Sequence, residues 1–200
     1  MSNFIYGVFV LAVVCLISTP LSFAGPATIY NCEQFIHNWR TPEWSTQRED
    51  HIISEMYVDK SFSRDGGVSL KLVVDFPGQE WRAGIVETEG EFDLTIYKSF
   101  SCEVYLPKNA PSGIEARLIF VTGENYIWFE MEKPISLDPG RKTKLFASLR
   151  RGVRCWSDGD KTMRLTDELK SEIRKLAIRI ESNKARYQGP VYIDNIRLKK

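Results

Sequence analysis

The sequence predicts an all-β fold, an antiparallel β-sandwich with one short helix. Apolar and polar residues alternate along several short segments, and turns rich in proline and glycine separate these segments. A composition of 43% hydrophobic and 26% charged residues is typical of a globular domain and excludes a disordered chain or a multi-span membrane protein. A formal net charge of +1 argues against nucleic-acid binding, which needs an excess of Lys and Arg.

The chain begins with an uncharged segment, and its first charged residue is Glu33. The apolar run from Phe4 to Ile17 is followed by a proline and by small residues up to Ala24, as in an export signal. This run is shorter than the roughly 20 residues that span a bilayer, which disfavours the alternative of a retained anchor. We therefore predict a signal peptide at 1–24, a single domain at 25–200, and a secreted or periplasmic protein with no membrane attachment after cleavage.

Alternation with a period of two predicts most of the strands. In the segment 69–76, Leu70, Leu72, Val74 and Phe76 fall on one face. Strands are expected, in chain order, at Ile29–Phe35, Ser69–Phe76, Phe100–Leu106, Ala116–Thr122, Tyr126–Met131, Lys144–Leu149, Arg174–Ser182 and Val191–Leu198.

A helix is expected at Asp167–Lys175, because Thr166 can cap its first turn and acidic residues follow the cap. The segment from Arg150 to Met163 shows no periodicity and is expected to be a loop that carries Trp156. Because Trp39, Trp44 and Trp156 lie in irregular segments, we expect their rings to be buried.

Signal cleavage would remove Cys15 and leave Cys32, Cys102 and Cys155. Three cysteines in an exported chain allow one internal disulfide at most, and the sequence does not choose the pair. There is no CxxC motif, and neither histidine has a cysteine nearby, so a zinc site is not expected.

Two carboxylates fall on strand faces that the alternation predicts to be inward. Asp194 shares its phase with Ile196 and Leu198, and Glu33 occupies a similar position in the expected first strand. An unpaired buried carboxylate costs several kcal/mol, so each acid needs a cation or a place at the rim of the sheet. First and last strands often lie side by side in a sandwich, so both acids can meet at one hard cation, most simply calcium. A salt bridge at the rim is the alternative.

An ordered set of residues across the chain resembles the galactose-binding-like β-jelly-roll carbohydrate-binding modules. The set comprises Glu33, Asp65–Lys71, Trp81, Phe92–Leu94, Tyr97, Val104–Pro107, Trp128 and Val191–Ile196. The resemblance implies that the domain binds a polysaccharide. It also implies that Glu33 and Asp194 hold a structural calcium, with Asp65 as a further ligand. The chain departs from the pattern after the Pro139-Gly140 turn, where many such modules carry a tryptophan.

Sugar binding needs aromatic faces that stack on C–H surfaces and planar polar groups that bind hydroxyls. The outward positions supply both, so we expect a concave platform for a plant- or algal-type polysaccharide, with no nucleic-acid partner and a monomeric module. The expected platform residues are Trp128, Tyr126, Tyr105, Glu103, Arg117, Arg179 and Trp81. In the alternative, Trp128 packs under a loop and the arginines pair with Glu103 and Glu181 as a solvated surface.

No catalytic residues are predicted. The segment Glu91–Ile96 begins like the E-x-D-x-x-E motif of laminarinase-like hydrolases, but Ile96 stands where the second glutamate is needed. Two other functions remain as alternatives on the same fold: a domain that binds an envelope protein, and a glycoside hydrolase or polysaccharide lyase.

Overall fold

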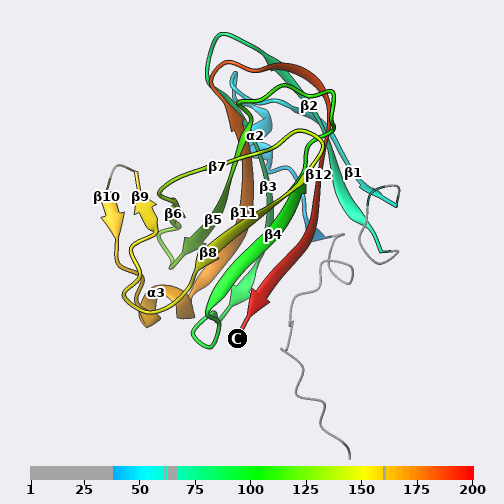
Figure 1. Ribbon diagram of the computed structural model, residues 1–200. Helices are drawn as coiled ribbons and strands as arrows, with labels where there is room; N and C mark the ends of the chain where they lie inside the picture. The colour runs from blue at the N-terminus through cyan, green and yellow to red at the C-terminus, as the bar shows by residue number, and fades with distance from the viewer. Residues whose placement is uncertain (1–37, 61, 63–66, 160) are drawn as a thin grey trace, which may run out of the picture.

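The computed structural model describes residues 38–60, 62, 67–159 and 161–200, which form two antiparallel β-sheets packed face to face. In Figure 1, β4, β8 and β12 lie in front of β3, β5 and β11. The all-β sandwich predicted from the sequence is therefore confirmed. The predicted signal peptide, the expected strand at 29–35, Glu33, Cys32 and Asp65 lie outside the described residues.

The first sheet has five strands and the second has seven. The five-stranded sheet contains, in spatial order, β1 (Ile53–Asp59), β2 (Ser69–Pro77), β12 (Arg186–Lys199), β4 (Ser99–Tyr105) and β8 (Lys142–Ser148). The seven-stranded sheet contains, in order, β10 (Lys161–Met163), β9 (Trp156–Asp158), β6 (Ile127–Met131), β5 (Glu115–Thr122), β11 (Ile173–Ser182) and β3 (Arg82–Phe92), and β7 (Ile135–Ser136) pairs with β5.

The core lies between the two sheets and is built from the alternating residues. On β2, Leu72 and Val74 are fully buried, as the alternation predicts. Aromatic rings fill the core beside β5, β6 and β9. There Phe120 stacks on Phe129 with ring centroids 5.1 Å apart and meets Trp156 edge-on with centroids 4.5 Å apart. Interlocking rings of this kind add to the stabilisation that burial itself provides.

Two predicted elements differ from the structure. The expected loop at 150–163 contains the hairpin of β9 and β10, because fully buried Trp156 anchors β9 beside β6. The expected helix is α3 (Asp167–Ser171), and Thr166 caps it by accepting a hydrogen bond from the Leu169 amide at 3.3 Å. The helix ends earlier than predicted because β11 begins at Ile173, so Arg174 and Lys175 belong to that strand.

The predicted inward phase of Asp194 is wrong. A β-bulge lies between Asp194 and Arg197, and Asn195 adopts a positive φ of 52°. This bulge changes the face of the strand, so Ile193 and Ile196 both enter the core. Asp194 pairs in register with Glu103 and lies with it on the outer face of the five-stranded sheet, although it is only 6% exposed.

A short N-terminal segment covers the outer face of the seven-stranded sheet near β3. Arg40 exchanges both backbone hydrogen bonds with Glu87 on β3, at 2.9 and 2.8 Å. The segment continues into α2 (Glu43–Thr46), where the Ser45 hydroxyl lies 3.1 Å from His51 Nδ1. His51 Nε2 in turn lies 2.7 Å from the Ile53 carbonyl, which ties α2 to β1.

Two further observations concern the described part of the chain. Within it, no helix is long and apolar enough to cross a membrane. Cys155 is a free, half-buried thiol, so the structure forms no disulfide between Cys102 and Cys155. Burial is the main cause of the raised pKa of the Cys155 thiol.

Candidate functional site: a tryptophan-lined cavity on the seven-stranded sheet

The outer face of the seven-stranded sheet has an apolar centre. Ile85 on β3, Ala177 on β11 and Ile119 on β5 form a small buried cluster separate from the main core, and Trp128 on β6 packs against it. Such a cluster is unusual on the outer side of a sandwich, where polar side chains are expected. Side chains from outside the sheet therefore cover this face.

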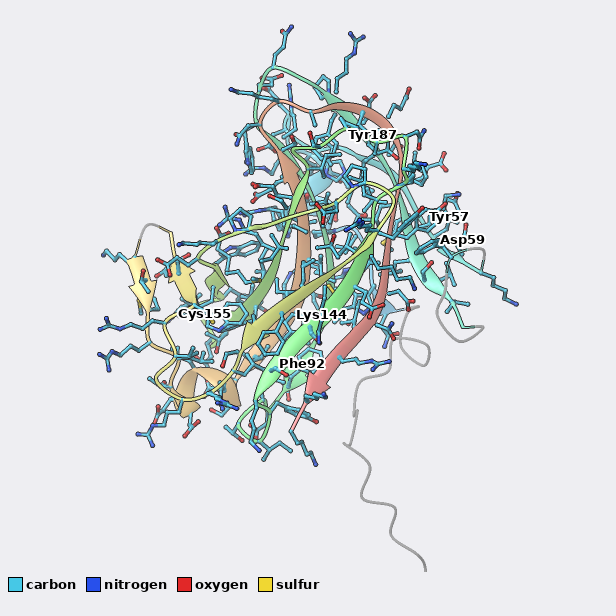
Figure 2. All side chains as sticks on the ribbon, in the orientation of Figure 1. Tyr57, Asp59, Phe92, Lys144, Cys155 and Tyr187 are labelled. Carbon is cyan, nitrogen blue, oxygen red and sulfur yellow. The ribbon has the colours of Figure 1, made fainter. Side chains whose placement is uncertain are left out.

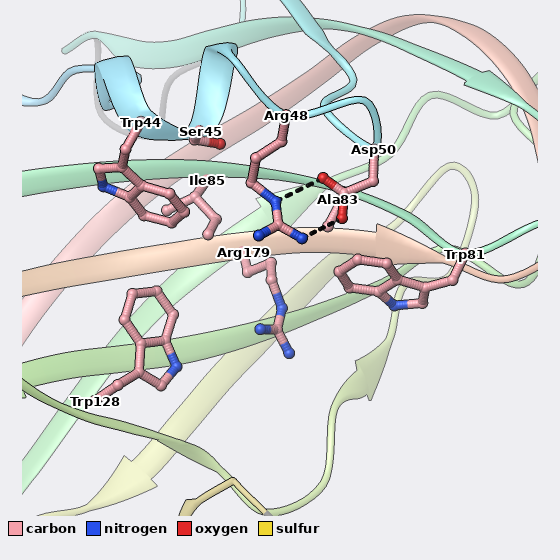
Figure 3. A pocket seen from close by; sticks show the side chains of 9 residues that line it. All are labelled: Trp44, Ser45, Arg48, Asp50, Trp81, Ala83, Ile85, Trp128 and Arg179. Atoms are coloured by element: carbon pink, nitrogen blue, oxygen red, sulfur yellow. Dashed lines mark hydrogen bonds and ion pairs between the residues drawn. The ribbon is translucent and has the colours of Figure 1, made fainter.

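Three tryptophans surround a cavity of about 280 Å³ on this face, which we call the tryptophan cavity (Figure 3). Trp44 comes from α2, Trp81 from the turn before β3, and Trp128 from β6. Trp44 and Trp81 are each 41% exposed, so part of each indole is open to solvent at the cavity. The cavity is lined by Trp44, Ser45, Arg48, Asp50, Trp81, Ala83, Ile85, Trp128 and Arg179.

The rings are held in fixed relative positions. Trp44 meets Trp128 edge-on, with ring centroids 6.0 Å apart and planes at 83°. Figure 3 shows Arg179 between Trp128 and Trp81, and its guanidinium lies 5.9 Å from the Trp81 ring centroid. The cavity therefore offers two aromatic walls separated by a guanidinium.

The sheet surface under the tryptophan cavity, which we call its floor, carries a network of charged groups. Glu130 Oε1 accepts hydrogen bonds from Arg117 Nη1 at 3.0 Å and Arg179 Nη2 at 3.1 Å. Its Oε2 accepts one from Trp128 Nε1 at 3.1 Å and lies 2.8 Å from Arg179 Nη1. Glu181 completes the network, with ion pairs of 2.6 Å to Arg117 and 2.8 Å to Arg179. Glu130 thus fixes both the Trp128 ring and the Arg179 guanidinium.

The rim of the cavity carries a second ion pair. Arg48 donates to both carboxylate oxygens of Asp50, at 2.8 and 2.6 Å, and both residues line the cavity (Figure 3). The hydrogen bond from Arg48 lowers the pKa of Asp50, and the same bond raises the pKa of Arg48. Asp50 therefore stays ionised in mildly acidic solution.

The structure separates the predicted platform residues between two faces. Trp128, Arg179 and Trp81 line the tryptophan cavity, and Arg117 lies next to it in the charged network. Tyr126 lies in the turn before β6 and is 60% exposed.

Glu103 and Tyr105 lie on β4, on the outer face of the other sheet. The prediction of one platform is therefore wrong, because alternation shows that a residue points outward but not from which sheet.

Trp44 is the cavity residue that the sequence reasoning missed. Trp39 and Trp156 are buried as predicted, at 3% and 0% exposure, but Trp44 is not. The signal that could have found it was a tryptophan two residues after Pro42 in a polar segment, where no neighbouring residue in the sequence is apolar enough to bury the ring. The ion pair of Arg179 with Glu181, expected only in the alternative in which the arginines form a solvated surface, is found beside the exposed aromatic cavity.

The outer face of the five-stranded sheet carries a second row of aromatic and basic residues. Tyr57, Lys71, Tyr192, Tyr105 and Lys142 are cross-strand partners in a line across all its strands. The hydrogen bond that Lys71 donates to Tyr57 is the main cause of the raised pKa of Lys71. Figure 2 shows Tyr57 on β1, at the opposite edge of this sheet from β8.

Asp194 lies beside this row. Its Oδ1 accepts the Asn195 amide at 2.7 Å, and its Oδ2 lies 3.8 Å from Lys142 Nζ. The neighbouring Glu103 Oε2 accepts from Asn195 Nδ2 at 2.8 Å. Within the described ranges, no group of three His, Cys, Asp or Glu residues is placed to hold a metal ion.

Solved structures with the same architecture cover most of the chain. The chain has the β-sandwich fold of carbohydrate-binding modules. A Caldicellulosiruptor saccharolyticus module, CBM27-1, solved with mannohexaose, is 20% identical, covers 87% of this chain and 96% of its own, and has a TM-score of 0.56. The module TmCBM27, described for specific mannan recognition, is 18% identical over 84% and 91%, with a TM-score of 0.53.

A CBM28 module, specific for non-crystalline cellulose, is 14% identical over 82% of this chain and 88% of its own, with a TM-score of 0.60. No protein-family model and no curated protein sequence matches the chain. These likenesses establish the fold, and the chemistry of the cavity has to be argued from its own residues.

Proposed function

We propose that the protein is a non-catalytic carbohydrate-binding module that binds a polysaccharide in the tryptophan cavity. The observation that carries this proposal is the partial exposure of Trp44 and Trp81 around a cavity with a rigid charged floor. Exposed indole faces stack on the C–H surfaces of sugar rings, and the flanking arginines and carboxylates bind hydroxyls. The structural neighbours with mannohexaose, mannan and cellulose in their descriptions support the same ligand class.

The charged groups at the cavity are suited to binding rather than to glycoside hydrolysis. A glycosidase needs one carboxylic acid with a raised pKa that protonates the leaving group. Here Glu130 and Glu181 are each bound by two arginines, and Arg48 lowers the pKa of Asp50. None of these three carboxylates is placed as a proton donor.

Isothermal titration calorimetry against soluble β-glucans, mannans, xylans and galactans tests the proposal. We expect one ligand group to bind, and we expect Trp81→Ala and Trp128→Ala to reduce its affinity by at least ten-fold. Phe146→Ala is the matched control, because Phe146 is 51% exposed on the five-stranded sheet. Absence of binding to every polysaccharide, or unchanged binding in both tryptophan variants, would contradict the proposal. Release of reducing sugar would instead support the hydrolase alternative.

A structural calcium is the second part of the proposal. Asp194 would hold the ion together with Glu33 and Asp65, both of which lie outside the described residues. A nearly buried carboxylate is a suitable oxygen ligand for Ca²⁺. The ammonium of Lys142, 3.8 Å from Asp194 Oδ2, competes with a cation at this oxygen. Calcium would stabilise the fold through its binding energy and would take no part in sugar chemistry.

Thermal unfolding with and without a chelator tests the calcium. A metal that binds only the folded state stabilises it by about 2.7 kcal/mol at 100 times its Kd. We expect the chelator to lower the Tm of the wild type and to leave that of Asp194→Ala unchanged. An equal Tm for the wild type with and without chelator would exclude the ion.

Export is the third part of the proposal. We propose that residues 1–24 are a signal peptide and that the remaining chain is a secreted or periplasmic monomer. N-terminal sequencing of the expressed protein should start at Gly25, and light scattering should give the mass of one chain. A mature protein that begins at Met1 would contradict the signal peptide.

A further inference from the structure

A second cavity lies on the other side of Trp44. It has a volume of about 660 Å³ and is bounded by the segment 40–46, β3 and β11. We call it the Glu87 cavity, after the buried carboxylate in its wall. Trp44 lines both this cavity and the tryptophan cavity, so the two are neighbours that share one indole.

Glu87 is buried without full satisfaction of its carboxylate. Its side chain is 1% exposed, and its Oε1 accepts a hydrogen bond from Lys175 Nζ at 2.8 Å. Among the described residues, no group donates a hydrogen bond to its Oε2. A buried acceptor without a donor is costly, and in native proteins such an atom calls for a specific explanation. A hydroxyl of a bound ligand would supply the missing donor.

The charges around Glu87 cancel within the cluster. Lys175 forms ion pairs with both Glu87 and Glu89, and Arg40 forms an ion pair with Glu89. Burial opposes the charged form of Lys175, but its bonds to the two glutamates raise its pKa, so the ammonium persists. The two acids and two bases of this cluster balance, and Glu43, which also lines the cavity, leaves an excess of one negative charge. This excess disfavours an anionic ligand, and the ammonium beside Oε1 disfavours a metal ion. The cavity is therefore suited to a neutral molecule rich in hydroxyls.

The register of the sheet connects the two cavities. Trp128 on β6, Val121 on β5 and Lys175 on β11 lie in one cross-strand row, so Trp128 and Lys175 are two strand spacings, about 10 Å, apart. In the adjacent row, the apolar residues Ile119 and Ala177 separate Glu130 from Glu87. These intervening side chains are buried, so a polymer chain that occupies both cavities would pass over the partly exposed ring of Trp44, which lines both.

We propose that the Glu87 cavity is a second subsite for a neutral sugar unit of the same polysaccharide chain, in which the free oxygen of Glu87 accepts a ligand hydroxyl. This inference rests on the proposed function, since it assigns one more binding position to the same ligand. It makes the module selective for chains long enough to occupy both sides of Trp44. Shorter oligosaccharides fill the tryptophan cavity alone.

Calorimetry with a series of neutral oligosaccharides, from disaccharide to hexasaccharide of the polymer that binds, tests the subsite. In the wild type, affinity should increase again once the chain reaches the Glu87 cavity. Glu87→Gln should weaken binding of the long members by about ten-fold, as expected for a hydrogen bond to a charged group, and leave the short members unchanged. Thr46→Phe should do the same by filling the cavity from α2, away from the ion pairs.

Glu91→Gln is the matched control, because Glu91 is 89% exposed on the same strand and pairs with Arg174. It should bind every member like the wild type. If Glu87→Gln fails to fold, Thr46→Phe decides the matter. Equal affinities in wild type and variants at all lengths, or an equal loss at all lengths, would overturn the subsite. Failure of the proposed function would look different, because the wild type would then bind no saccharide of any length.

Discussion

Removal of Glu130 is the most direct perturbation of the candidate site. Its carboxylate binds Arg117, Arg179 and the Trp128 indole, and the side chains of the three charged residues are only 13–19% exposed. Loss of one partner from a buried ion pair costs about 3–5 kcal/mol. Both arginines keep Glu181, and some water reaches them, so we expect Glu130→Ala to lower the free energy of unfolding by about 2–3 kcal/mol.

Urea denaturation followed by tryptophan fluorescence measures this change. A loss of about 2–3 kcal/mol corresponds to a Tm decrease of roughly 4–12 °C for a domain of this size. Glu130→Gln is the control, because its amide oxygen still accepts hydrogen bonds, and it should cost less than Glu130→Ala. A double-mutant cycle with Arg179→Ala should give a coupling energy of about 1–3 kcal/mol.

The same variant tests the role of Glu130 in holding the Trp128 ring. If the ring is fixed by its bond to Glu130, Glu130→Ala should weaken polysaccharide binding even at temperatures where the variant is fully folded. A loss of stability below about 0.5 kcal/mol, the level of an ordinary surface substitution, would refute the network as described. Normal stability together with weak binding would restrict the role of Glu130 to the ligand.

Three further predictions concern the fold. Leu72→Ala should lower the free energy of unfolding by about 2–5 kcal/mol in urea denaturation, because Leu72 is fully buried between the sheets. Thr166→Ala should lower it by about 1 kcal/mol in the same assay, because α3 loses its cap. Arg48 and Lys175 lower the pKa values of Asp50 and Glu89. The ionised carboxylates of Asp50 and Glu89 therefore stabilise the folded state fully above their ordinary pKa values of 3.8 and 4.5. This stabilisation is lost as pH falls through the lowered pKa values of the folded state. The urea concentration at the unfolding midpoint should decrease as pH falls through this acidic range, and it should decrease less steeply in Asp50→Asn. An identical pH dependence of the midpoint in the wild type and this variant would contradict the ion pair.

The strands with clear alternation could be predicted because one of their faces is buried in a continuous core. β3 could not, since both of its faces are covered: the main core lies on one side, and α2 with the segment at Arg40 lies on the other. Its first half, Ala83–Val86, is therefore a continuous non-polar run, and only its glutamates, Glu87, Glu89 and Glu91, recur with a period of two. The pairs between Glu87, Glu89 and Lys175 explain why charged residues are tolerated there.

Part of the candidate site could be predicted because it lies on strands that alternate clearly. Trp128 and Arg179 were correctly placed outward, since their strands alternate. Tyr105 was assigned to the same surface because a sequence does not show which sheet a strand joins. Asp194 was assigned to the wrong face because a bulge with a positive φ at Asn195 leaves no periodic signal. Trp44 depends on a four-residue helix, which is too short to give any period.

Trp44 comes from α2 and not from either sheet, so different segments of the chain build the wall of the tryptophan cavity and the core. The floor of the tryptophan cavity belongs to the sheet, but one wall belongs to α2, which is attached through the backbone of Arg40 and through the contacts of His51. Replacement of the segment 41–48 would change the width and chemistry of both cavities, while the residues between the sheets would stay the same. Under the proposed function, exchange of this one short surface segment would give the same sandwich a different sugar preference.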